Sequence, residues 1–174
     1  MFRRSFLATG AGALLSACGF QPVYMPTASG KAGVAQRELA AIHVNLIPDR
    51  PGQELRQALQ DRLEMGSDSV ARRYDLTVAF GVSGEGIGIQ NNDTATYVRM
   101  LGNANWTLTA QDPGRTKLSS GYAKAVDSLN VFDGQYFNSD LETEAIEKRM
   151  AEALADQITI QLAAYFRKRA AGGG

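Results

Sequence analysis

The feature that most restricts the fold is a series of three segments with two-residue periodicity, followed by one long helical segment. The first segment spans residues 74–82 and places large apolar side chains at every second position, namely Tyr74, Leu76, Val78, Phe80 and Val82. The same alternation returns over 97–110 and, more weakly, over 117–128. Such alternation is typical of strands with one buried face. A Gly- and Asn-rich loop at 83–96 and an Asp112-Pro113-Gly114 turn separate the segments, so we expect an antiparallel meander.

The long helical segment runs from about Asn138 to about Arg169. Ser139 and Glu142 fit a capping box at its start. Apolar side chains then occupy every fourth position: Ile146, Met150, Leu154, Ile158, Leu162 and Phe166. On a helix with 3.6 residues per turn, each such step advances the stripe by about 40°. The stripe therefore winds around the helix, so we expect that different parts of the helix bury different faces or that a second surface covers part of it.

Two further elements precede the meander. Residues 39–47 alternate well enough for a strand, and the Pro-rich stretch at 48–52 is typical of a turn. Residues 53–65 then predict a helix, because leucines recur at every fourth position, at Leu55, Leu59 and Leu63. The order strand, helix, strand, strand, strand, helix predicts an α+β fold. We expect a two-layer sandwich in which two helices pack on one face of a four-stranded mixed sheet.

The other face of this sheet is expected to remain uncovered by helices. From the phases of the strands, it would carry Thr77, Ala79, Gly81, Asn103, Asn105, Thr107, Ser119, Gly121, Ala123 and Ala125. These side chains are small and mostly neutral, whereas a solvated sheet face usually carries more Lys and Glu. Two interpretations stay open: another protein covers this face, or it is a solvated face rich in Thr and Asn.

The amino terminus has the three parts of an export signal. A positive start at residues 1–4 is followed by an apolar run at 6–15 and by Leu15-Ser16-Ala17-Cys18. This last pattern resembles the bacterial lipobox, in which the thiol is diacylated, the chain is cut before it and the new amino terminus is acylated. Cys18 is the only cysteine of the chain, so no disulfide partner competes for it. We therefore predict that residues 1–17 are a lipoprotein signal peptide and that Cys18 carries the lipids.

The predicted anchor sets the division of the chain. Residues 18–37 are rich in Pro, Gly and other small residues and predict a lipidated, flexible tether. One α+β domain follows at 38–169, and a disordered Gly-rich tail at 170–174. Two or more acyl chains hold a protein firmly on a membrane. Paired arginines in the signal leave both the Sec and the twin-arginine export routes open.

Composition gives little support to catalysis or to nucleic-acid binding. The chain has 18 basic and 18 acidic side chains, whereas nucleic-acid binding usually needs a clearly basic face. His43 is the only histidine, so neither a histidine–cysteine metal cluster nor a catalytic triad with a recognisable motif is expected. The stretch Gly84–Gly88 lacks the spacing of a phosphate-binding loop. We expect no enzyme, no cofactor and no metal.

A resemblance to a known family rests on the start of the mature chain. The run Cys18-Gly19-Phe20-Gln21-Pro22-Val23-Tyr24 closely resembles the start of the lipopolysaccharide (LPS)-assembly lipoproteins, the LptE family. The order of the predicted elements is also similar to the fold of that family. The resemblance implies a lipoprotein on the periplasmic side of the outer membrane. Its partner would be an LptD-like β-barrel that translocates LPS, which the lipoprotein plugs and helps to assemble, aiding LPS delivery to the outer leaflet.

The resemblance also implies contact with LPS, whose phosphates pair with Lys and Arg side chains. The candidates are Arg99, on the outward phase of its strand, and Lys124. An alternative from another class is a periplasm-facing accessory lipoprotein that binds a small amphiphile or a transporter. An apolar cavity between helices and sheet would favour that alternative, whereas a filled core would favour the plug.

Overall fold

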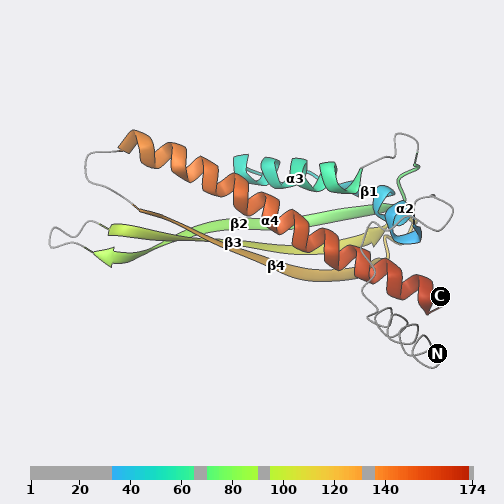
Figure 1. Ribbon diagram of the computed structural model, residues 1–174. Coiled ribbons are helices and arrows are strands. Elements are labelled where there is room, and N and C mark those ends of the chain that lie inside the picture. Colours follow the sequence, from blue (N-terminus) through green and yellow to red (C-terminus); the bar gives the residue numbers. More distant parts are fainter. Residues whose placement is uncertain (1–32, 65–69, 90–94, 131–135, 173–174) are drawn as a thin grey trace, which may run out of the picture.

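Strands with alternating apolar side chains and helices with an apolar stripe form an open sheet that has helices on one face (Figure 1). The computed structural model describes residues 33–64, 70–89, 95–130 and 136–172. Its elements, in chain order, are α2 (Val34–Ala40), β1 (Ile42–Val44), α3 (Arg50–Leu63), β2 (Tyr74–Ile89), β3 (Ala95–Ala110), β4 (Lys117–Asn130) and α4 (Tyr136–Ala171). The predicted α+β class is confirmed.

The sheet has the strand order β1-β2-β3-β4. β1 lies parallel to β2, while β2–β3 and β3–β4 are antiparallel. The prediction of a mixed sheet that contains an antiparallel meander is therefore confirmed. Along β2 and β3 the even-numbered residues face the helices, as expected, so that Leu76, Val78, Trp106 and Leu108 are buried.

The prediction of a loop over 83–96 is wrong. β2 continues to Ile89 and β3 begins at Ala95, and the two strands stay paired along this length. Register shifts at Gly86–Gly88 and Gly88–Ile89 accommodate the glycines. Glycine has no side chain to show an alternating pattern, yet its backbone pairs with a neighbouring strand like that of any residue. Pairing across the hairpin therefore decides the strand length here.

The apolar stripes of the two long helices are confirmed. α3 buries Leu55, Leu59 and Leu63, and all six predicted stripe residues of α4 are buried. Along its length α4 contacts β4, β3, α3 and α2, so its winding stripe does pack on different elements in turn. The predicted capping box is wrong, because α4 already begins at Tyr136, before Ser139.

The first elements differ from the prediction in three respects. A third helix, α2, forms over residues 34–40, although 34–37 were assigned to the tether. It buries Ala35 and Leu39 and packs against the carboxy-terminal part of α4, so its stability comes from a tertiary contact. The predicted strand 39–47 shortens to β1, and α4 extends into the predicted tail as far as Ala171.

The phase of β4 is the main correction. Ala123 and Ala125, predicted on the uncovered face, are buried on the helix side, whereas Tyr122 and Val126 are exposed. A Cβ at Gly121 would lie 2.6 Å from Trp106 Cζ2 and 2.6 Å from Gln161 Oε1. Ser119 pairs with the buried Leu108. Small residues are needed there because α4 approaches the sheet closely, whereas the prediction turned the larger apolar side chains inward.

Candidate functional site

The uncovered sheet face is the first candidate surface. The β2 and β3 residues predicted for it lie there, namely Thr77, Ala79, Gly81, Asn103, Asn105 and Thr107. The corrected phase of β4 adds Tyr122, Lys124 and Val126 in place of the four small β4 residues. Val126 is 56% and Tyr122 49% exposed. The side chains of this face are thus less uniformly small than the sequence indicated.

Arg99 lies on this face and is already paired. Its guanidinium donates to Glu85 Oε2 at 2.6 Å, across the β2–β3 pair. Both side chains are about half exposed, at 45% and 57%. Exposed ion pairs of this kind contribute only about 0–1 kcal/mol. Exchange of Glu85 for a phosphate of a bound molecule would therefore cost little.

Lys124 lies on the same face, opposite Asn103 on β3. In the part of the chain that the structure describes, no carboxylate forms an ion pair with its ammonium group. Asn103 is four residues from Arg99 along β3, which corresponds to roughly 14 Å. The structure therefore places the two predicted LPS contacts on one face without bringing them into contact.

An apolar pair lies between the two cations. Leu101 is paired with Val126 across β3 and β4, one row from Arg99 and one row from Lys124. Leu101 is half-buried and Val126 exposed. Two cations that flank an apolar pair suit an amphiphile with anionic groups. The sequence analysis did not find this pair, because it placed the odd-numbered residues of β4, from Ser119 to Ala125, on the uncovered face and so turned Val126 inward. Lys124 was the signal for the correct phase: a charged side chain does not fit the buried face, and Val126, two residues further on, points to the same side of the strand as Lys124.

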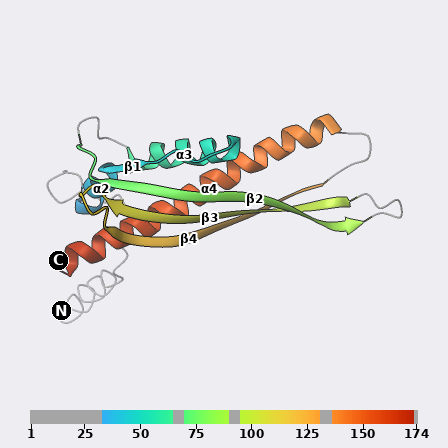
Figure 2. The same cartoon turned by 180° about the vertical axis from the view of Figure 1, so that it is seen from behind.

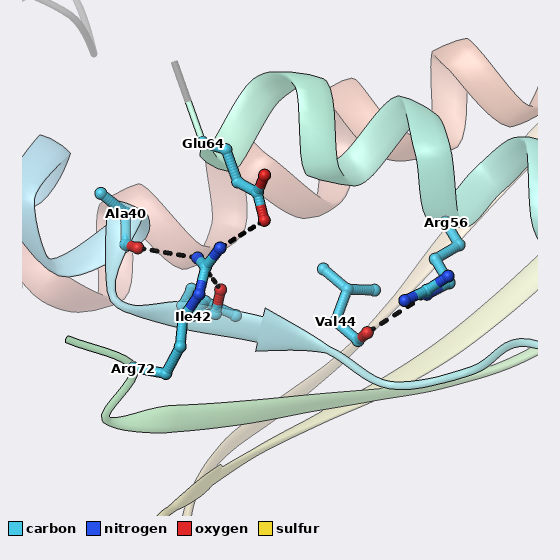
Figure 3. Close-up of polar contacts among 6 residues, drawn as sticks. All are labelled: Ala40, Ile42, Val44, Arg56, Glu64 and Arg72. Atoms are coloured by element: carbon cyan, nitrogen blue, oxygen red, sulfur yellow. Dashed lines mark hydrogen bonds and ion pairs between the residues drawn. The ribbon is translucent and has the colours of Figure 1, made fainter. Parts of the chain in front are cut away.

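The edges of the sheet form a second candidate surface, and side chains close much of them. On the outer edge of β1, the Arg72 guanidinium donates to the carbonyls of Ala40 at 3.0 Å and Ile42 at 2.9 Å, and Arg56 donates to that of Val44 at 3.3 Å (Figure 3). Glu64 pairs with Arg72 and holds it in place. These guanidinium groups occupy the carbonyls that another strand would need.

Part of the outer edge of β4 is closed by α4. Gln157 Nε2 donates to the Lys124 carbonyl at 3.0 Å, and its Oε1 accepts from the Lys124 N–H at 3.3 Å. Gln161 Nε2 donates to the Tyr122 carbonyl at 3.0 Å, while its Oε1 accepts from Trp106 Nε1 at 2.9 Å. Two side-chain amides thus take the place of a neighbouring strand.

Among the described elements, the edge of β2 has no neighbouring strand beyond the end of β1. β1 ends at Val44, opposite Leu76, and within the described residues no strand lies beside β2 beyond that point (Figure 2). A groove of about 210 Å³ adjoins this stretch. It is lined by Pro48, Asp49, Pro51, Gly52, Phe80, Gly81, Val82 and Glu147.

The space between the helices and the sheet is occupied by side chains. Leu55, Leu76, Leu108, Leu154 and Ile158 are fully buried there. A groove of about 440 Å³ lies instead on the outer side, between α3 and α4. Most of its lining side chains are charged or polar: Glu54, Gln57, Asp61, Arg62, Lys148 and Glu152. This arrangement suits a plug better than a carrier of a small amphiphile.

Two further features concern catalysis and the membrane. His43 is exposed on β1, and within the described ranges no group of three His, Cys, Asp or Glu side chains is placed to hold a metal ion. Across the same ranges, none of the helices combines the length and the apolar character that a bilayer span requires. The predicted lipidation site, Cys18, lies outside the described residues.

Solved structures of three lipoproteins share the fold. A lipoprotein from Caulobacter crescentus is 18% identical, with a TM-score of 0.61 over 76% of this chain and 96% of that chain. The rare lipoprotein B from Shewanella oneidensis is 12% identical, with a TM-score of 0.53 over 71% and 92%. Lipoprotein B from Nitrosomonas europaea is also 12% identical, with a TM-score of 0.50 over 76% and 86%. At such identities the likeness concerns the fold alone.

Sequence comparison identifies the family. A search of curated proteins found no match. The sequence model of the family described as "LptE: Lipopolysaccharide-assembly" matches residues 39–162, which is most of the chain and includes every strand of the sheet. The chain therefore belongs to the LptE family of lipopolysaccharide-assembly lipoproteins.

Proposed function

We propose that this lipoprotein is anchored through Cys18 to the outer membrane, on its periplasmic side, and plugs an LptD-like barrel that translocates LPS. Members of the family are outer-membrane lipoproteins that work with LPS and the outer-membrane translocon. In this proposal the chain helps the barrel to assemble and aids delivery of LPS to the outer leaflet, without catalysing a reaction.

The observation that carries the proposal is the uncovered sheet face. Arg99 and Lys124 flank the pair Leu101 and Val126 on an otherwise nearly neutral surface. Cations pair with the phosphates of LPS, and the apolar pair suits its acyl chains. The filled core behind this face is consistent with a rigid plug.

The test is to extract membranes with a mild detergent and recover the lipoprotein through a tag on its carboxy-terminal tail. We expect a stoichiometric outer-membrane barrel protein whose gel mobility changes on heating. Recovery of the lipoprotein alone would contradict the proposal. Recovery with subunits of an inner-membrane transporter would favour the accessory lipoprotein instead.

A further inference from the structure

We propose that the open edge of β2, from Phe80 to Gly86, binds an extended, basic segment of the barrel partner as an additional strand. The identity of the partner rests on the proposed function, whereas the edge itself is a property of this fold. The added segment would run beside the groove that contains Asp49 and Glu147.

The direction of the backbone groups follows from contacts near the start of β2. The Tyr74 N–H donates to the Ala41 carbonyl at 3.2 Å, and the Leu76 carbonyl accepts from the Asn45 N–H at 3.0 Å. Even-numbered residues of β2 therefore direct their N–H and C=O groups away from β3. Because this direction alternates along a strand, and the register with β3 has no shift before Gly86, the same holds further on. The backbone groups directed away from β3 belong to Val78, Phe80, Val82, Gly84 and Gly86; Val78 is buried, Phe80 and Val82 are half-buried, and Gly84 and Gly86 are exposed.

Unlike the edges of β1 and β4, this stretch of β2 lacks the side chains that usually protect a strand edge. Proteins usually protect sheet edges with charged side chains, proline or covering elements. Here Arg56 and Arg72 close β1, and Gln157 and Gln161 close part of β4. The stretch 80–86 contains no Lys, Arg or Pro, and its Glu85 side chain pairs with Arg99 on the sheet face. An extended peptide adds to such an edge through main-chain hydrogen bonds.

Charge identifies the kind of segment that fits. Asp49 and Glu147 line the groove beside Phe80 and Val82. The nearby Arg50 is already engaged, because its guanidinium donates to Glu144 Oε1 at 2.7 Å. The groove is therefore acidic and favours Lys or Arg on the occupant. A second copy of this chain fits less well, because pairing two β2 edges would bring two acidic grooves together.

The first test compares amide hydrogen exchange in the purified lipoprotein and in its complex with the barrel. We expect the amides of Phe80, Val82, Gly84 and Gly86 to exchange at least about tenfold more slowly in the complex. Val82→Pro removes one exposed N–H without breaking a bond to β3, and we expect it to lower barrel recovery by about tenfold. Ser120→Pro is the matched control, since its N–H also lies on the outer edge of β4 and the residue lies outside the rows of Arg99, Leu101 and Lys124. Thermal unfolding of each isolated variant verifies its fold.

Charge provides a second test that leaves the backbone intact. Glu147→Lys reverses a charge of the groove, so we expect it to weaken barrel recovery, most strongly at low salt. Glu152→Lys is the control, because Glu152 belongs to α4 but lines the separate groove between α3 and α4.

The outcomes separate this inference from the proposed function. Recovery of the barrel without slower exchange over 80–86, or equal recovery by the two proline variants, would overturn the edge inference and leave the proposed function intact. Slow exchange in an isolated chain that is dimeric would assign the edge to a second copy and also overturn it. Failure of the unaltered chain to recover any barrel would refute the proposed function, and the assignment of the occupant with it.

Discussion

Single side chains on the uncovered face differ in how readily they can meet a ligand. Arg99 must leave Glu85 before it binds an anion, whereas the Lys124 ammonium forms no ion pair with a carboxylate of the described residues. The exposed pair costs little to open. Each cation is therefore available for a phosphate, from positions on either side of Leu101 and Val126.

We expect the double variant Arg99→Ala with Lys124→Ala to bind purified LPS at least about tenfold more weakly, because hydrogen bonds to charged groups contribute about 1.5–3 kcal/mol. Glu85→Gln should strengthen binding, since it releases Arg99. Titration calorimetry measures both effects, and Lys117→Ala, at the other end of β4, is the control. Unchanged binding by the double variant would remove both residues from the LPS contact.

The acidic groove predicts a pH effect on stability. Burial raises the pKa of Glu147, and the carboxylates of Glu54 and Glu144 raise it further, while Arg50 opposes them. An acid whose pKa is raised by folding destabilises the folded chain once it is ionised, and this penalty disappears below its ordinary value of 4.5. We therefore expect Glu147→Gln to be more stable than the unaltered chain near pH 7, and this advantage to disappear well below pH 4.5.

Urea unfolding at the two pH values measures this difference, with Glu152→Gln as a control on the same helix. An equal gain in stability at both pH values would show that the effect comes from packing and not from charge.

At the level of elements, the approach of α4 to the sheet depends on small residues in β4. Gly121 lies under Trp106 and Gln161, and Ala123 and Ala125 continue this strip. Gly102 on β3 has the same role, since a Cβ there would lie 2.6 Å from Met150 Cε. The helix can therefore lie close enough for Gln157 and Gln161 to reach the β4 backbone.

We expect Gly121→Ala to lower the free energy of unfolding by about 1–3 kcal/mol, because the added methyl group overpacks the space beside the Trp106 ring. Gly81→Ala is a close control, since nothing lies within 4 Å of a Cβ at that position on the uncovered face. Urea unfolding monitored by Trp106 fluorescence compares the two variants. Similar losses would mean that the α4 contact does not depend on a small residue at 121.

At the level of the whole molecule, the sheet of the described residues has a helix-covered face, an uncovered face and a β2 edge with no strand beside it beyond β1. We predict that the lipids at Cys18 attach this domain to the membrane. We expect Cys18→Ser to carry no acyl chains and to appear in the soluble fraction, because the domain then lacks its lipid anchor. Cell fractionation and the mass of the amino-terminal peptide test this, with Ser29→Ala as the control. Retention of Cys18→Ser in the membrane would show that another contact holds the chain there.

The sequence by itself determined the α+β class, the stripes of α3 and α4, and the side of the sheet on which Arg99 lies. These properties follow from local periodicity, which a chain carries before it folds. Only the tertiary structure decided the phase of β4, the length of the β2–β3 hairpin, helix α2 and the closure of the edges. Each of these depends on partners distant in the chain: α4 over Gly121, β3 beside the glycines of β2, and Arg72 against the carbonyls of Ala40 and Ile42. Local periodicity does not record such contacts, because their free energy arises only when the layers pack together.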